Sequence, residues 1–324
     1  MYSSRLTFLL TVVMAGFILS PVTGEALDFP KQPITLICGH APGGSNDIHN
    51  RVLAEAAKKY FSQNVVPTCV TGGGGSVAIS RVVNAKPDGY SLCYSGPPYH
   101  RISFWNKLPF SPLEDTTPII QVWGSTYSLI VRGDSPFKDV KDLVAYAKAN
   151  PKKLKYMTAG IGSGMNVIML QLQSATGIEF THVPGKGEAD AVVAVLGGHV
   201  DMMPATLTTA EPHALAGNFR ILLFFTEQRT KAYPDIPTAK ELGYNIVEQS
   251  ELGIHGPKGL PEEIVKALHD GFKKAMFDPI FVSHCKKTHA PILYLNTADY
   301  QKLMRTSYGK QKEAYERIVS QLKK

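Results

Sequence analysis

The chain has 324 residues, of which 44% are apolar and 19% are charged, and its formal net charge is +7. This length is typical of about two packed units. The apolar content excludes a disordered chain, and scattered prolines without a heptad repeat exclude a coiled coil. The positive charge is dispersed and forms none of the focused basic stripes that nucleic-acid binding requires. We therefore expect no nucleic acid among the partners and leave small anions open.

The N-terminus has the features of an export signal. Arg5 precedes the apolar run Leu6–Leu19, and small residues follow around Gly24. This order is typical of a secretory signal peptide, and the run is shorter than the ~20 residues of a membrane-spanning helix. We expect residues 1–24 to form the signal peptide, with cleavage near Gly24 or Ala26, and the mature protein to be exported.

The four cysteines do not form a metal or redox motif. Cys38, Cys69, Cys93 and Cys285 lie far apart and none is part of a CxxC sequence, so we expect neither a zinc site nor a thioredoxin-like site. The first three lie in expected strands of one sheet. Export permits disulfides, so buried free thiols and one disulfide among these three both remain open.

The first part of the chain alternates short apolar strands, glycine-rich loops and helices. Strands are expected at Pro33–Cys38, Asn64–Val70 and Gly89–Tyr94. The loop at 39–44 leads to Ser45, which can act as the N-cap of an amphipathic helix. The glycine-rich segment at 71–76 leads to a second helix at Val77–Asn84. This alternation predicts an α/β fold with a mostly parallel sheet.

A second set of α/β units follows without a low-complexity linker. Its expected helices are Val140–Asn150, Met165–Ala175, a segment around Ala189–Leu196, and the C-terminal Tyr300–Leu322, with Leu303, Ala314, Ile318 and Leu322 facing inward. Its expected strands are Thr126–Arg132, Leu154–Thr158, Phe180–Val183, Val200–Met203, Phe219–Phe225 and Gly253–Gly256. We therefore expect two α/β lobes joined by strands, with a cleft and a hinge between them.

Two loops share a strand–glycine–helix pattern, one in each set. They are Ala41–Asp47 (APGGSND) and Gly160–Asn166 (GIGSGMN). A helix N-terminus has unpaired N–H groups and the positive end of the helix dipole, and glycine lets a ligand approach the backbone. Neither loop has the lysine of a P-loop. Each pattern predicts an anion site, with a carboxylate as the favoured anion, although a tight turn alone explains it too.

The sequence contains neither the GxSxG motif of serine hydrolases nor the HExxH motif of zinc enzymes. We expect no catalytic residues, no metal and no cofactor. His40 borders the first glycine loop and either donates to a ligand carboxylate or packs. Asp47 stabilises the helix N-terminus, or contacts a ligand directly.

Six motifs occur along the chain in the same order as in one known family. They are APGGSND at 41–47, KPDGYSL at 86–92, KLPFSPLED at 107–115, THVPGKG at 181–187, LGGHVDMM at 196–203 and KAYPDIPTAKELGY at 231–244. Together they are similar to the substrate-binding receptors of tripartite tricarboxylate transporters, the Bug-type periplasmic proteins. The resemblance spans essentially the whole mature chain.

The resemblance implies an α/β, two-lobed periplasmic binding protein of type II, with a hinge and a central ligand cleft. Residues 25–127 and 250–324 would form lobe 1, and residues 128–249 would form lobe 2. Such a protein captures a small organic carboxylate in the periplasm and delivers it to membrane transporter subunits. The ligand-binding residues that the resemblance implies are Ala41, Gly44, Ser45, Asn46, Asp47, Ser95, Gly160, Gly162, Ser163, Asn166, Pro204 and Thr206. To these we add His40, because it borders the first glycine loop.

The chain departs from the family pattern at several of these positions. The family usually has an aromatic residue at His40, threonine at Asn46 and an acidic or polar residue at Pro204. Gly185 stands where tyrosine is usual, and Asn166 where histidine is common. We expect a larger pocket beside Gly185, and we expect His40 to bind a second carboxylate or a hydroxyl group of the ligand. A ligand-sensing receptor for a signalling partner and an exported enzyme using the same cleft are the alternatives.

Overall fold

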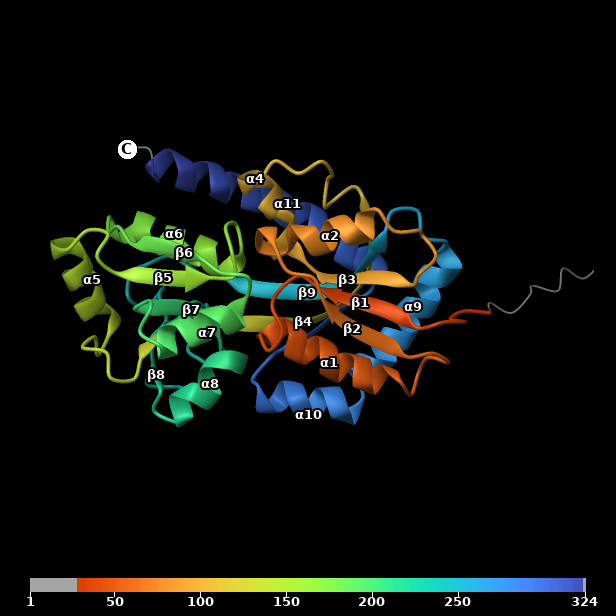
Figure 1. Ribbon diagram of the computed structural model, residues 1–324, viewed down its shortest axis with the longest axis horizontal. Coiled ribbons are helices and arrows are strands. Elements are labelled where there is room, and N and C mark those ends of the chain that lie inside the picture. Colours follow the sequence, from red (N-terminus) through yellow and green to blue (C-terminus); the bar gives the residue numbers. More distant parts are fainter. Residues whose placement is uncertain (1–27, 323–324) are drawn as a thin grey trace, which may run out of the picture.

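A computed structural model describes residues 28–322, which form an α/β molecule of two lobes side by side (Figure 1). The expected signal peptide lies outside the described residues. Lobe 1 contains β1 (Ile34–Cys38), α1 (Ser45–Ala57), β2 (Val65–Cys69), a 3-10 turn (Gly73–Gly75), α2 (Ser76–Val83), β3 (Ser91–Ser95), α3 (Pro97–His100), α4 (Ile102–Trp105), β9 (Gln249–Pro257), α9 (Glu262–Met276), α10 (Pro279–Lys287), β10 (Ile292–Leu295) and the start of α11 (Thr297–Leu322).

Lobe 2 is inserted between β4 (Thr116–Arg132) and β9. It contains α5 (Val140–Ala149), β5 (Lys155–Thr158), α6 (Gly164–Thr176), β6 (Thr181–Pro184), α7 (Glu188–Leu196), β7 (Met202–Thr206), α8 (Leu207–Leu215) and β8 (Phe219–Phe224). The long strand β4 (Thr116–Arg132) belongs to both lobes.

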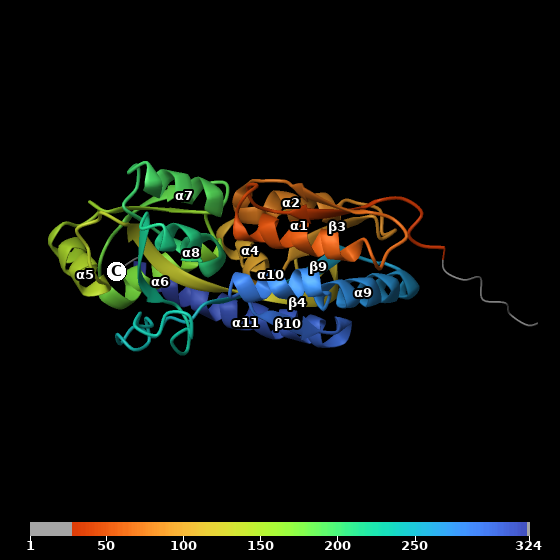
Figure 2. The same cartoon turned by 90° about the horizontal axis from the view of Figure 1, so that it is seen from below.

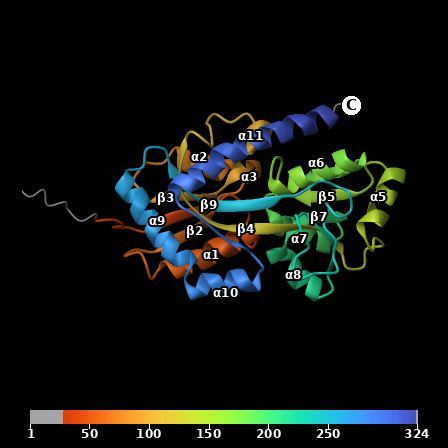
Figure 3. The same ribbon diagram turned by 180° about the vertical axis from the view of Figure 1, so that it is seen from behind.

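One continuous sheet links the lobes, in the order β2-β1-β3-β9-β4-β7-β5-β6, with β10 and β8 also pairing with β4. Strand β4 pairs with β9 from Thr116 to Thr126 and with β7 from Tyr127 to Val131. Figure 3 shows β4 and β9 running through the middle of the molecule. The change of partner at Thr126 and Tyr127 therefore marks the passage from one lobe to the other.

The expectation of a mostly parallel sheet is wrong. Parallel pairing occurs only inside each lobe, between β1 and its neighbours β2 and β3 and between β5 and its neighbours β6 and β7. The central strands β4 and β9 pair antiparallel with each other and with β3, β7, β8 and β10. The sheet is mixed because these two strands carry the chain between the lobes in opposite directions.

Each lobe has its own hydrophobic core. The lobe 1 core gathers Leu36, Leu92, Trp123 and Phe272, and the lobe 2 core gathers residues of β4, β5, α6 and β8. Fully burying one such side chain contributes on the order of 1.5–3 kcal/mol. Since the cores are separate, each lobe is a packed unit that can keep its structure while the other moves.

Helix α11 crosses from lobe 1 to lobe 2 (Figures 2 and 3). It begins against β4, where Thr297 Oγ1 donates to Ile119 O at 2.7 Å, and it later contacts α6. Of the residues expected to face inward, Ile318 is buried and Leu303 and Ala314 are half-buried, whereas the Leu322 side chain lies outside the described residues. The helix therefore provides a third connection across the two lobes.

Several local predictions need correction. Gly44, rather than Ser45, is the N-cap of α1, and Ser45 is the first helical residue. Strand β7 ends at Thr206 rather than at Met203, so Pro204 and Thr206 lie inside it rather than after it. Helices α3, α4, α8, α9 and α10 and strand β10 were not predicted. Elements α3, α4 and β10 have only four residues each, too few for a pattern, whereas α9 has 15 residues with apolar residues at helical spacing and was detectable from the sequence.

All four cysteines are free, so no disulfide links the strands in this structure. Within residues 28–322, no helix has the length and apolar content needed to cross a membrane. The same residues contain no cluster of three or more His, Cys, Asp or Glu side chains that suits a metal ion.

Candidate functional site

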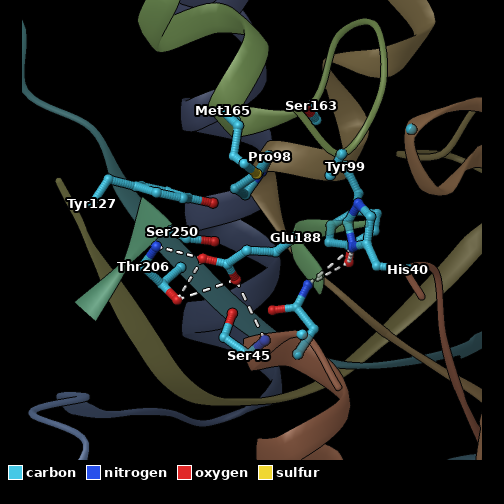
Figure 4. A pocket seen from close by; sticks show the side chains of 15 residues that line it. His40, Ser45, Pro98, Tyr99, Tyr127, Ser163, Met165, Glu188, Thr206 and Ser250 are labelled. Carbon is cyan, nitrogen blue, oxygen red and sulfur yellow. Dashed lines mark hydrogen bonds between the residues drawn. The ribbon is translucent and has the colours of Figure 1, made fainter. Parts of the chain in front are cut away.

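A small cavity lies between the lobes at the N-termini of α1 and α6 (Figure 4). Its lining comes from both lobes and from the strands that join them: His40, Gly44, Ser45, Asn46, Gly74, Pro98 and Tyr99 from lobe 1, Ala159, Ser163, Gly164, Met165, Glu188 and Thr206 from lobe 2, and Tyr127 and Ser250 from β4 and β9. The free space is about 40 Å³, which accommodates only a few water molecules. The lobes are therefore closed over the cavity.

Glycine loops allow this close approach of the lobes. Ala41 N in lobe 1 donates to Lys186 O in lobe 2 at 3.2 Å. A Cβ atom at Gly187 would lie 2.6 Å from Ala41 N, and one at Gly74 would lie 2.7 Å from Ile161 O. Real Cβ atoms do not approach backbone so closely, so these glycines are required for the closed arrangement.

The N-terminus of α1 binds a carboxylate of the protein itself. Ser45 N donates to Glu188 Oε2 at 3.3 Å, across the boundary between the lobes. Inside lobe 2, Thr206 N and Thr206 Oγ1 donate to Glu188 Oε1 at 2.5 and 2.9 Å, and Thr209 Oγ1 donates to it as well. Glu188 is only 6% exposed. The anion site predicted at this helix end is thus occupied by an internal anion.

The N-terminus of α6 is arranged differently. Ser163 caps the helix by accepting from Asn166 N at 3.3 Å, and Asn166 Oδ1 accepts from Gly162 N at 3.0 Å. Gly164 and Met165, the first helical residues, line the cavity. N–H groups in the first turn have no acceptor within the helix, so these two are the backbone donors that the second lobe offers to a ligand.

His40 offers a side-chain donor from the first lobe. Asn46 Nδ2 donates to Tyr99 Oη at 2.7 Å, and the Tyr99 hydroxyl lies 2.8 Å from His40 Nδ1. Asn46 Nδ2 also lies 3.2 Å from His40 Nδ1. An amide nitrogen can only donate, so Nδ1 is an acceptor and the imidazole proton lies on Nε2. Burial lowers the pKa of His40 to about 4. The neutral ring therefore carries an Nε2–H group, which is buried without a partner.

An ion pair lies directly behind the cavity. Arg101 Nη2 lies 2.7 Å from Glu248 Oε1, and both side chains are largely buried. The guanidinium also lies close to Gly164, where an added Cβ would be 2.8 Å from Arg101 Nη2. Burial raises the pKa of Tyr127, with Glu188 and Glu248 adding to the rise and Arg101 opposing it. The charges of Glu188, Glu248 and Arg101 therefore act on Tyr127, which lines the cavity.

The cavity brings together six of the thirteen residues expected to bind a ligand: His40, Gly44, Ser45, Asn46, Ser163 and Thr206. Asp47 instead supports the loop behind them, accepting from Gly43 N at 3.0 Å and pairing with Arg51 at 2.9 Å. Burial opposes ionisation of Asp47, but hydrogen bonds from Arg51 and Gly43 outweigh it and lower its pKa.

The other expected residues surround the cavity without lining it. Ala41 and Gly160 lie where the lobes meet, and Gly162 packs on Trp105. Asn166 lines a separate surface hollow beside β6. Ser95 is buried in β3, Pro204 lies inside β7, and Gly185, where a larger pocket was expected, does not line this cavity.

Sequence reasoning missed Glu188, Tyr99, Tyr127 and Ser250. Tyr127 and Ser250 lie on the two strands that join the lobes, and only the tertiary structure brings these strands to the cavity. Glu188 was detectable in part, because an acidic residue directly after the glycine of VPGKG stands at a helix N-terminus. Nothing in the sequence showed that it would reach the opposite lobe.

Two lobes closed over a polar cavity and joined by two strands are the architecture of a periplasmic solute-binding protein. The sequence matches the family model described as "Tripartite tricarboxylate transporter family receptor" over residues 49–320. The chain therefore belongs to this family, and the expected α/β, two-lobed, type II fold is confirmed.

Relatives and solved structures agree with this assignment. A Cupriavidus necator protein named "UPF0065 protein in gbd 5'region" is 36% identical over 303 residues, covering 94% of this chain and 92% of that protein. The periplasmic binding protein BugD superposes with a TM-score of 0.87 at 28% identity, covering 90% of this chain and 99% of that one. MatC of Rhodopseudomonas palustris, solved with bound malate, has a TM-score of 0.85 at 25% identity, covering 89% and 100%.

Proposed function

We propose that this protein captures a small organic carboxylate in the periplasm and delivers it to the membrane subunits of a tripartite tricarboxylate-type transporter. The observation that carries the proposal is the set of donors from both lobes around one cavity: the first-turn N–H groups of Gly164 and Met165 and the Nε2–H group of His40. Malate bound to the related MatC supports a carboxylate as the ligand class.

Ligand capture would work by a shift between open and closed lobes. A carboxylate that touches donors on both lobes binds the closed form more tightly than the open form, and so raises its population. Strands β4 and β9 are the connections about which the lobes would move, with lobe 1 formed by residues 25–127 and 250–324 and lobe 2 by residues 128–249. A transporter would then recognise the closed form.

Binding without chemistry is part of the proposal. Among the described residues that line the cavity, His40 is the one histidine, and its Nδ1 is engaged by Tyr99 rather than by a nucleophile and an orienting acid. Periplasmic location through cleavage of residues 1–24 is likewise proposed, supported by two structural relatives, one described as a periplasmic binding protein and the other as a periplasmic transporter.

A thermal-shift screen of the mature protein against mono-, di- and tricarboxylates and amino acids tests this function. We expect at least one carboxylate to raise the melting temperature in a concentration-dependent manner, because a ligand that binds only the folded state stabilises it. His40→Phe should weaken the shift, since it removes the Nε2–H donor. The proposal is overturned if no carboxylate shifts the melting temperature while a solute without a carboxylate does.

A further inference from the structure

Glu188 places a negative charge inside the candidate ligand site. Its carboxylate lines the cavity and is 6% exposed. Both of its oxygens accept from backbone N–H groups, Oε2 from Ser45 and Oε1 from Thr206. An N–H group can only donate, so this arrangement stabilises the ionised carboxylate. In the closed form, the α1 helix end of the site is therefore occupied by the protein's own carboxylate.

No basic side chain among the described lining residues offsets this charge. Lysine and arginine are missing from the lining, and His40 is neutral because burial holds its pKa near 4. Arg101 lies behind Gly164, but it is paired with Glu248 at 2.7 Å. The cavity thus carries the net charge of Glu188, in a closed site where water screens charges poorly.

The two helix ends therefore favour different parts of a ligand. At α6, the first-turn N–H groups of Gly164 and Met165 are free of helix acceptors and can bind a carboxylate. At α1, the Ser45 N–H group is engaged by Glu188, and a second ligand carboxylate would face a like charge. Repulsion of this kind discriminates between ligands as effectively as attraction does.

We propose that Glu188 determines the ligand class of this site and selects a short amino carboxylate, with its carboxylate at the α6 end and its ammonium group toward Glu188, over a dicarboxylate of the same length. This inference rests on the proposed function, because it assumes that the cavity binds a carboxylate. Beyond the proposed function, we infer that the site binds one carboxylate of the ligand and repels a second carboxylate at its other end, where it prefers a positive group.

Matched ligand pairs test the selection by calorimetric titration of the mature protein. In each pair one carboxylate is replaced by ammonium: malonate and glycine, succinate and 3-aminopropanoate, glutarate and 4-aminobutanoate, adipate and 5-aminopentanoate. We expect wild type to bind the amino member of its best pair about tenfold or more tightly than the dicarboxylate.

The variant Glu188→Gln keeps the size of the side chain and removes its charge. We expect it to abolish or reverse the preference within the best pair. Asp190→Asn is the matched control, because Asp190 lies in the same helix turn but is exposed and outside the cavity lining. The control should keep the wild-type preference.

The outcomes separate this inference from the proposed function. If wild type binds dicarboxylates as tightly as their amino partners, or if Glu188→Gln keeps the wild-type ranking, the inference is wrong while carboxylate binding stands. If neither member of any pair binds and no other carboxylate does, the proposed function fails too. The wild-type ranking decides the question even if Glu188→Gln does not fold.

Discussion

The two glycine loops at the cavity share one sequence pattern but have different partners. At α1 the N-cap is Gly44, which makes no side-chain cap, and the first helical N–H group binds Glu188 of the other lobe. At α6 the N-cap is Ser163, whose side chain caps Asn166, and the first-turn residues face the cavity. The α1 end is thus filled by the protein, and by our proposal the α6 end binds the ligand.

A helix N-terminus therefore predicts that an anion binds there, but it does not predict which anion. The same electrostatic preference serves closure of the lobes at α1 and, by our proposal, ligand capture at α6. The two lobes also differ in their buried histidines, because His40, His49 and His255 all lie in lobe 1.

Acid should destabilise lobe 1 more than lobe 2. In lobe 1, burial lowers the pKa of His49 and His255 to about 3 and that of His40 to about 4. In lobe 2, burial lowers the pKa of His182 to about 4. Between these values and the ordinary 6.5, the unfolded chain binds more protons than the folded one. Stability therefore falls as pH drops below about 6.5, by ~1.4 kcal/mol per pKa unit and group.

Urea unfolding followed by tryptophan fluorescence at about pH 7 and about pH 4.5 measures this effect. Trp123 is fully buried in lobe 1 and stacks on His49 with ring centroids 3.8 Å apart. We expect the free energy of unfolding to fall by several kcal/mol between the two conditions. His49→Gln should reduce the pH dependence, and an unfolding free energy that is constant over this range would contradict the prediction.

Alanine substitutions in the two loops should have unequal effects on ligand binding. Gly160 has φ +119° and its added Cβ would lie 3.1 Å from the Gly74 backbone of the other lobe, whereas Gly43 has φ +83° and its Cβ would meet nothing closer than 3.9 Å. Both variants should lose about 1–3 kcal/mol of stability through backbone strain. Only Gly160→Ala should also hinder closure and weaken ligand binding, by about tenfold.

Urea titrations and calorimetry with the ligand found in the screen check these two variants side by side. Gly43→Ala serves as the control for backbone strain without a steric clash between the lobes, because its Cβ would meet Ala189 of lobe 2 at an ordinary contact distance of 3.9 Å. Equal affinities of the two variants would show that closure does not require the contact between Gly160 and Gly74.

The smallest expected difference concerns the two serines. Ser163 Oγ accepts from Asn166 N at 3.3 Å, so Ser163→Ala should cost about 1 kcal/mol of unfolding free energy. The Ser45 side chain is not the cap of α1, so Ser45→Ala should change stability by no more than about 0.5 kcal/mol. Chemical denaturation of both variants measures the difference, and a larger loss for Ser45→Ala would reverse the comparison between the helix ends.

Local patterns predicted the strands and helices that form the two loops. The apolar runs at β1 and β5 and the glycines after them placed α1 and α6 within one or two residues of their observed starts. The pattern failed where tertiary contacts decide the outcome. Strand β4 extends back to Thr116 because β9 pairs with it along its length, and Asn166 turns away from the cavity to accept from Gly162 N.

The sequence by itself determined the alternation of strands and helices, the two anion-receptive helix ends and the family, because hydrophobic period, glycine placement and motif order are properties of the local chain. That an internal carboxylate fills the α1 end depends on the tertiary structure. Glu188 and Ser45 are 143 residues apart in the chain, and only closure of two separately packed lobes brings the carboxylate of one to the helix dipole of the other.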